Sequence, residues 1–162
     1  MHEFQGEECV MRTSTRAKAA AVIGAGLLGL TLVAPAYASE QGVAEARQVQ
    51  DGYRNCLDGG TIPPTVQTCT DSRYQLWYVT GPDKEKAFQN AVTLGCLDGY
   101  EPVARVIGCD VSLPGQRWGV GPGIVGSTLQ NGANLRYLTS QGVGWPVITD
   151  GARGDLGQQW QW

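Results

Sequence analysis

The stretch QRW at residues 116–118 is one of three Gln-x-Trp tripeptides in this chain of 162 residues. The others are QLW at 75–77 and QQW at 158–160, so the three glutamines lie 41 and 42 residues apart. Periods of about 20–50 residues are typical of a structural unit that is repeated along the chain. We therefore predict three units, at about residues 46–83, 84–125 and 126–162.

Other positions align with the tripeptides and support the same register. Each unit opens with an apolar residue, then Gln, then Asp or Asn: Val49-Gln50-Asp51, Phe88-Gln89-Asn90 and Leu129-Gln130-Asn131. A leucine follows in every unit, at Leu57, Leu97 and Leu138. These shared columns indicate that the three units have the same local structure.

Four of the five cysteines lie within the repeats, at positions 56, 69, 96 and 109. Four cysteines allow three disulfide pairings, and composition alone does not choose between them. In each of the first two units a second cysteine follows the first by 13 residues. This register selects the pairs Cys56–Cys69 and Cys96–Cys109. The third unit has Tyr137 at the first cysteine position, so we expect packing to hold it, with Tyr137 and Trp145 as fillers.

The N-terminal segment has the order of a secretory signal peptide. Basic residues between Arg12 and Lys18 precede the apolar run 19–33, and Ala36-Tyr37-Ala38 ends in a small-x-small pattern. The apolar run is shorter than the roughly 20 residues that a membrane-spanning helix needs. We expect residues 1–38 to be removed, with translation starting at Met1 or Met11, and residues 39–162 to form one secreted domain.

Short apolar pieces alternate with turn-forming pairs throughout the repeats, and the chain has 23 glycines. This pattern predicts an all-β domain with four strands of about five residues in each unit. Only residues 43–49 and 82–90 carry a short helical pattern. Because four short strands cannot bury an apolar face alone, we expect the three units to close around one shared core.

Three Gln-x-Trp units, two of them with Cys-Leu-Asp and an internal cysteine pair, resemble the ricin-B-type lectins. The resemblance covers residues from about Val49 to Trp162 and implies a β-trefoil, a six-stranded barrel capped by three hairpins. The tryptophans of the tripeptides, Trp77, Trp118 and Trp160, are expected to be core residues, with the glutamine amides bonding buried backbone groups.

The resemblance also implies sugar-binding residues. Asp58 and Asp98 match the aspartate of Cys-Leu-Asp that accepts hydrogen bonds from sugar hydroxyls in these lectins. An alternative interpretation is that each aspartate only opens a tight turn, since glycine follows both. The candidate carbohydrate contacts are Asp58, Tyr74 and Gln75 in the first unit, Asp98, Tyr100 and Gln116 in the second, and Trp145 in the third.

No unit carries the complete lectin pattern. The family usually has an aromatic residue two positions before the second cysteine, where this chain has Gln67 and Ile107. It usually has Asn before the Gln-x-Trp glutamine, and here Tyr74, Gly115 and Gly157 take that place. In the third unit Thr139 occupies the aspartate position. The sites are therefore expected to be degenerate, and each aromatic candidate is equally well explained as packing between hairpins.

Composition narrows the class of function. The chain has 12 Lys and Arg against 15 Asp and Glu without a run of either sign, which does not favour nucleic acid or a membrane surface as partner. The single histidine is His2, in the leader, so a Ser-His or Cys-His pair is absent from residues 39–162. We expect no enzyme activity, no metal and no cofactor. The leading hypothesis is a secreted carbohydrate-binding module. The alternative is a β-trefoil that binds protein through loops 80–87 and 119–126.

Overall fold

The computed structural model describes residues 45–82 and 84–162. The predicted signal peptide and leader, residues 1–38, lie outside the described residues. Within the described part of the chain, no helix has the length and apolar character needed to cross a membrane.

The described residues contain thirteen strands and three 3-10 turns, and no α-helix. The strands of the first repeat are β1 (Arg47–Gln48), β2 (Gln50–Asp51), β3 (Cys56–Asp58), β4 (Thr65–Gln67) and β5 (Leu76–Thr80). Those of the second are β6 (Ala87–Asn90), β7 (Gly95–Asp98), β8 (Arg105–Gly108) and β9 (Trp118–Pro122). Those of the third are β10 (Ser127–Asn131), β11 (Tyr137–Thr139), β12 (Ile148–Asp150) and β13 (Trp160–Gln161). The turns η1 (Arg73–Gln75), η2 (Pro114–Gln116) and η3 (Leu156–Gln158) each end on a Gln-x-Trp glutamine.

The predicted all-β class and four strands per repeat are confirmed, because β1 and β2 are two parts of one strand interrupted at Val49. The two short helical stretches were wrong in their described parts. Arg47–Gln48 pairs with β5 as strand β1, and Ala87–Asn90 pairs with the same strand as β6. Pairing with a neighbouring strand here outweighs a weak local preference for helix.

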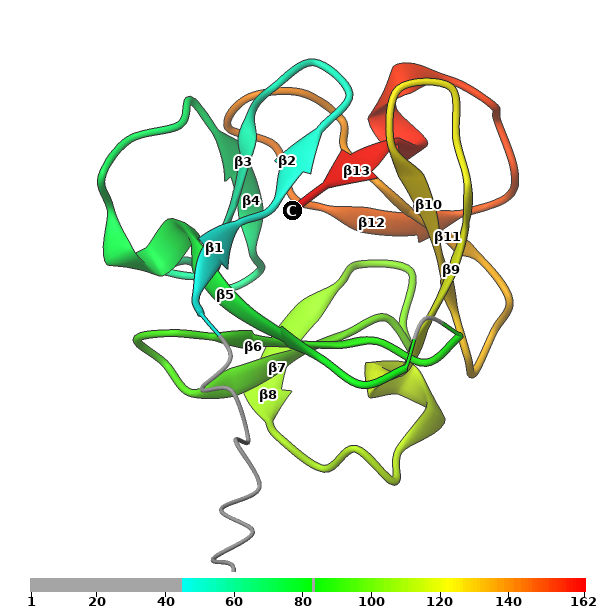
Figure 1. Cartoon of the computed structure of the whole chain (residues 1–162), viewed down its shortest axis with the longest axis horizontal. Coiled ribbons are helices and arrows are strands. Elements are labelled where there is room, and N and C mark those ends of the chain that lie inside the picture. Colours follow the sequence, from blue (N-terminus) through cyan, green and yellow to red (C-terminus); the bar gives the residue numbers. More distant parts are fainter. Residues whose placement is uncertain (1–44, 83) are drawn as a thin grey trace, which may run out of the picture. The chain divides into compact units, whose positions relative to one another are not determined.

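Six strands form a closed ring. β5 pairs with β1 and β6, β10 pairs with β9 and β13, and β13 pairs with β2. A bridge between Lys86 and Trp118 joins β6 to β9 and completes the ring. The hairpins β3–β4, β7–β8 and β11–β12 provide the remaining strands, one hairpin per repeat. The three lobes surround a common centre (Figure 1). This arrangement confirms the expected β-trefoil.

The tryptophans of the three Gln-x-Trp tripeptides lie fully buried in one core. Each indole N–H donates to the carbonyl oxygen of the repeat's shared leucine: Trp77 to Leu57 at 2.9 Å, Trp118 to Leu97 at 3.1 Å and Trp160 to Leu138 at 2.9 Å. The hydrogen bond satisfies the polar end of each ring while its apolar area fills the core. The predicted structural role of these residues is therefore confirmed.

The predicted disulfides Cys56–Cys69 and Cys96–Cys109 are both present. In the third repeat, Leu138 and Val147 fill the interior. Trp145, expected there as a filler, is instead 63% exposed. It lies on the loop between β11 and β12, where its carbonyl accepts a hydrogen bond from Val66 N–H at 3.3 Å.

Candidate functional site

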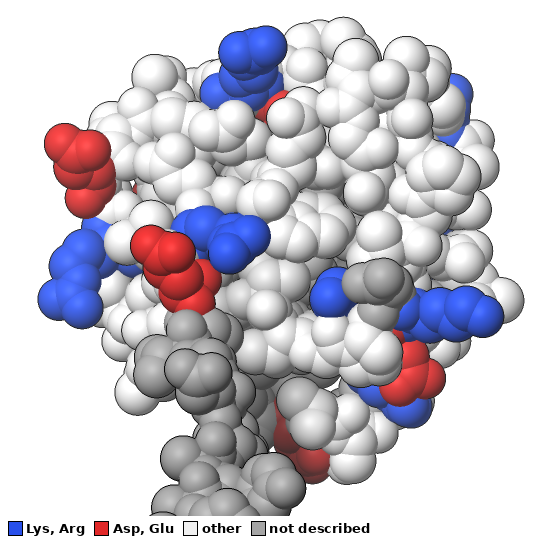
Figure 2. Space-filling view, in the orientation of Figure 1, with Lys and Arg blue, Asp and Glu red and all other residues white. Residues whose placement is uncertain are grey.

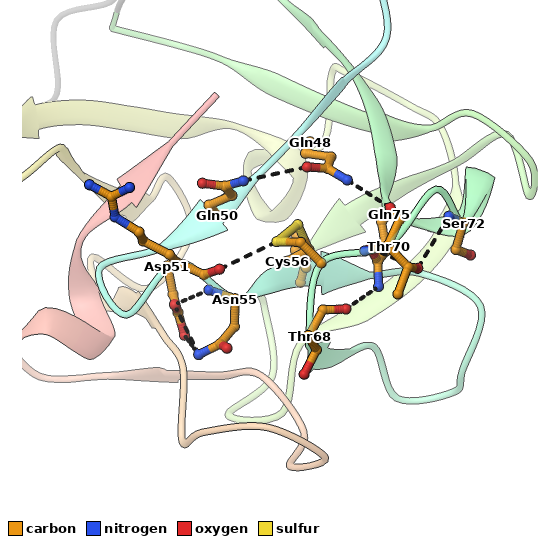
Figure 3. Close-up of a disulfide and its surroundings, with 12 residues drawn as sticks. Gln48, Gln50, Asp51, Asn55, Cys56, Thr68, Thr70, Ser72 and Gln75 are labelled. Atoms are coloured by element: carbon orange, nitrogen blue, oxygen red, sulfur yellow. Dashed lines mark hydrogen bonds between the residues drawn. A yellow bond between two sulfur atoms is a disulfide. The ribbon is translucent and has the colours of Figure 1, made fainter.

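The glutamine of each tripeptide holds the loop that precedes it. Gln75 Nε2 donates to Thr68 O at 3.1 Å, and Thr70 N–H donates to Gln75 Oε1 at 2.8 Å (Figure 3). Gln116 makes the same pair of bonds with Gly108 O and Asp110 N–H, both at 2.8 Å. Both side chains are buried. Their amides therefore shape the lobe, and a direct contact of Gln75 or Gln116 with a sugar stays a prediction.

The second repeat contains a cavity of about 310 Å³ between the β7–β8 hairpin and η2. Two of its lining residues, Asp98 and Tyr100, were predicted as site residues. Ile107 and Gly115, the two positions at which this repeat departs from the lectin pattern, also line it, whereas Glu101, Arg105, Leu113 and Pro114 were not predicted. Arg105 is the cross-strand partner of Asp98. The disulfide fixes the register of this hairpin, so the partner of Asp98 could have been located from the position of Cys109.

Asp98 has one oxygen engaged and one open. Its Oδ1 accepts a hydrogen bond from Tyr100 N–H at 2.9 Å, the turn role that the sequence suggested. A Cβ on Gly115 would lie only 2.6 Å from Oδ2, so glycine leaves this oxygen accessible from the cavity. Among the described residues no donor bonds Oδ2. Asp98 is only 7% exposed as a residue, so a ligand can approach its carboxylate over a small area.

The walls of this cavity combine apolar and charged groups. Arg105 Nη2 lies 3.5 Å from Glu101 Oε1, an exposed ion pair at the mouth. Tyr100 is 66% exposed and lines the cavity. On the face shown in Figure 2, charged side chains of both signs are scattered among uncharged surface, without a continuous patch of one sign.

In the first repeat the corresponding space is occupied by the protein itself. Asp58 Oδ1 accepts a hydrogen bond from Gly60 N–H at 2.8 Å. A Cβ on Gly60 would lie 2.8 Å from Tyr74 Cγ and 3.0 Å from Asp58 Oδ1, so the ring and the carboxylate lie against the same glycine. Tyr74 and Asp58 are therefore brought together as predicted, but the ring packs over the turn.

The third repeat has no carboxylate at the aspartate position. Thr139 is fully buried, donates from Oγ1 to Tyr137 O at 2.9 Å and accepts from Gln158 Nε2 at 3.0 Å. Trp145 does not line the described cavities next to this repeat. Within the described residues, no group of three or more His, Cys, Asp or Glu side chains is arranged to hold a metal ion.

Comparison with known proteins gives structural similarity only. No family model and no curated protein matches the sequence. A designed threefold-symmetric protein, ThreeFoil, superposes with a TM-score of 0.64 at 15% identity, over 72% of this chain and 96% of that one. The hemolytic lectin CEL-III superposes with a TM-score of 0.60 at 19% identity, over 73% of this chain. The chain has the fold of the β-trefoil lectins.

Another β-trefoil neighbour is a non-toxic homologue of type II RIPs from Momordica charantia, bitter gourd, in complex with α-methyl-D-galactoside. It superposes with a TM-score of 0.59 at 17% identity, over 72% of this chain. The match covers 30% of CEL-III and 48% of the bitter gourd protein, so those chains extend well beyond this β-trefoil.

Proposed function

We propose that this protein is a secreted carbohydrate-binding module whose second repeat holds a sugar in the cavity between Asp98 and Tyr100. The observation that carries the proposal is Asp98, a nearly buried residue on a cavity of about 310 Å³, whose Oδ2 has no donor among the described residues. Cavities of about 300 Å³ and more, with a few fixed polar groups, are typical of small-ligand sites.

The chemistry of the cavity suits a sugar ring. A carboxylate oxygen accepts strong, charge-assisted hydrogen bonds from hydroxyl groups. The exposed ring of Tyr100 offers an apolar face for the C–H side of a pyranose. Arg105, across the strand pair from Asp98, adds donors at the rim. Lectins of the same fold, such as the bitter gourd homologue with α-methyl-D-galactoside, make this ligand class a natural one to test.

Secretion and a non-enzymatic role belong to the same proposal. The two disulfides are typical of proteins that fold in an oxidising compartment. The cavity groups, one carboxylate with a tyrosine and an Arg–Glu pair, suit binding by hydrogen bonds and ring contact. We therefore propose a binding module without catalytic activity.

A second candidate function is protein binding. An apolar cavity of about 360 Å³ adjoins the first one, shares Glu101 and Arg105 with it, and is lined further by Ile62, Pro63, Pro102 and Val103. Ile62 and Val103 in its lining are 91% and 42% exposed, so they form an exposed apolar patch, the kind of surface that marks protein–protein contacts. This surface favours a protein partner if the sugar test below is negative.

The test is a broad glycan array, followed by titration of the best ligand into wild-type protein and Asp98→Asn. Asparagine keeps the turn bond from Tyr100 N–H through its own oxygen but removes the charge. A hydrogen bond to a charged group contributes about 1.5–3 kcal/mol, so we expect affinity to fall about tenfold to a hundredfold.

Asp71→Asn is the matched control, because Asp71 is exposed and lies outside the cavities described here. It should bind like the wild type. Unchanged affinity in Asp98→Asn, or no binding to any glycan on the array, would refute the proposed site.

A further inference from the structure

A second polar cavity, of about 420 Å³, lies where the third repeat meets the first. Its walls come from the loop after β11, the segment before η3, and the turn between β2 and β3. The lining residues are Tyr53, Asn55, Ser140, Gln141, Gly142, Arg153, Asp155 and Gly157. The cavity includes no residue of β12, whereas the Asp98 cavity includes Arg105 and Ile107 of β8. The cavity therefore shares two positions with the Asp98 cavity, since Gln141 and Gly157 stand where Tyr100 and Gly115 do, but its other wall comes from Tyr53 and Asn55 of the first repeat.

This cavity exists because one turn is shorter than its counterpart. In the turn after β10, Leu135 N–H donates to Asn131 O, four residues earlier. In the turn after β2, Arg54 N–H donates to Asp51 O, three residues earlier. The first repeat thus lacks one residue at this turn.

The residue that the first repeat lacks corresponds to Asn134 of the third repeat, which fills the junction between the second and third repeats. Between the second and third repeats, Asn134 Nδ2 donates to Gly99 O at 2.7 Å and to Tyr100 O at 3.1 Å. Ser140 takes the place of Gly99, since Ser140 N–H donates to Gly157 O as Gly99 N–H donates to Gly115 O. No asparagine reaches Ser140 and Gln141 from the shortened turn, and the space there stays open.

An unpartnered carboxylate faces this open space. Asp155 precedes η3, but its side chain makes no capping hydrogen bond, and no other partner bonds it among the described residues. A Cβ on Gly157 would lie 3.2 Å from Asp155 Oδ1, just as a Cβ on Gly115 would lie close to Asp98 Oδ2. Asp155 therefore places a carboxylate oxygen beside Gly157, as Asp98 does beside Gly115, although Asp155 comes from the segment before the 3-10 turn and Asp98 from a strand end.

The remaining walls complement this acceptor. Tyr53 is 57% exposed and lines the cavity. Gln141 and Asn55 bring side-chain amides, which also make long 3.4 Å bonds to Pro146 O and to the Asp51 carboxylate. Arg153 brings a guanidinium that also pairs with Asp150. Acceptor, donors and a ring face together match a molecule with several hydroxyl groups and one apolar side.

We propose that this cavity is a second carbohydrate site, which takes one hexopyranose unit with Asp155 as the hydroxyl acceptor and Tyr53 as the ring platform. The proposal rests on the proposed function for its ligand class, but its residues are independent of the Asp98 site. The third lobe would thus bind a sugar through Asp155, because Thr139, at the position of Asp98, is buried and its hydroxyl is already bonded.

The experiment follows backbone amide shifts by NMR while galactose, glucose, mannose and N-acetylglucosamine are each titrated into the wild-type domain. We expect at least one sugar to perturb amides around Tyr53, Gln141 and Gly157. Asp155→Asn should weaken this response at least tenfold and leave the response around Tyr100 unchanged. Asp98→Asn should do the reverse, and Asp71→Asn should change neither.

Folding does not confound this test, because the Asp155 side chain makes no hydrogen bond or ion pair in the described chain. A response around Tyr100 alone, or a Tyr53 response that survives Asp155→Asn, overturns the second site and leaves the proposed function intact. A response around Tyr53 alone supports the second site and refutes the Asp98 site. No response to any sugar refutes both.

Discussion

At the residue scale, the first repeat departs from the others at Asp51. Asn90 Nδ2 donates to Tyr74 O and Asn131 Nδ2 donates to Gly115 O, both at 2.7 Å. A carboxylate has no such donor, and Asp51 instead accepts a hydrogen bond from Ser140 Oγ at 2.7 Å. Because Asp51 is fully buried and Ser140 nearly so, this bond supplies a donor that the carboxylate needs.

We predict that Ser140→Ala destabilises the domain by about 1–3 kcal/mol, since it removes the short hydrogen bond to a buried carboxylate oxygen and leaves that oxygen only the 3.4 Å bond from Asn55 Nδ2. Asp51→Asn combined with Ser140→Gly recreates the pair used by the other repeats, Asn with Gly. The double variant should therefore be more stable than Ser140→Ala. Urea unfolding of wild-type, single and double variants measures this coupling. Additive free-energy changes would show that the two side chains do not act as a pair.

At the element scale, the third lobe lacks the disulfide that closes the other two hairpins. Tyr137 stands at the first cysteine position. Ala152 stands at the second, because the preceding carbonyl, Gly151 O, accepts from Gln158 Nε2 just as Gly108 O accepts from Gln116 Nε2. An exposed ion pair, Arg153 with Asp150, lies beside this position. The hydrogen bond from Arg153 and that from Gly151 N–H hold the pKa of Asp150 below its ordinary value.

We predict that Tyr137→Cys with Ala152→Cys forms a third disulfide. The two native bridges have Cα–Cα distances of 4.9 and 4.8 Å at equivalent positions. A loop of about 15 residues closed in this way gives about 3 kcal/mol in the chain-entropy model. Urea unfolding of the oxidised and reduced variant measures the gain. Equal stability of the two forms would contradict the equivalence of the three hairpins.

Much of the fold followed from the sequence because each lobe repeats the same residues in the same roles. The Gln-x-Trp spacing predicted the core tryptophans, and the cysteine register predicted the disulfides. The site was predicted only in part. Asp98 and Tyr100 are neighbours along one strand end, so a motif finds them. The cavity of Asp155 depends on a turn that is one residue shorter in another repeat, and no local pattern in the sequence shows which segments meet there.

At the scale of the whole molecule, the three lobes share one interior. The buried core combines Trp77, Trp118 and Trp160 with apolar residues of every repeat. Trp162, at the C-terminus near the centre of Figure 1, also packs edge-on against Phe88, with ring centroids 5.5 Å apart. A single lobe therefore has no core of its own.

We predict that residues 39–125 alone do not fold, because removal of the third lobe exposes the core and removes β10 and β13, the barrel partners of β9 and β2. Near-UV circular dichroism and NMR dispersion of this fragment should be those of an unfolded chain, with residues 39–162 as the folded control. A cooperative unfolding transition in the fragment would contradict the shared core.

The pairing of β13 with β2 joins the last strand of the chain to one of its first, with Trp160 opposite Asp51. The ring of strands is thus closed between β13 and β2 by backbone pairing, where residues 81–86 and 123–126 connect β5 to β6 and β9 to β10 along the chain. A short linker from Trp162 to the segment before β1, with a new opening between β5 and β6, would give a circular permutant in which every strand keeps its neighbours. The order in which the lobes follow one another in the sequence can then be changed, while their arrangement around the shared core stays the same.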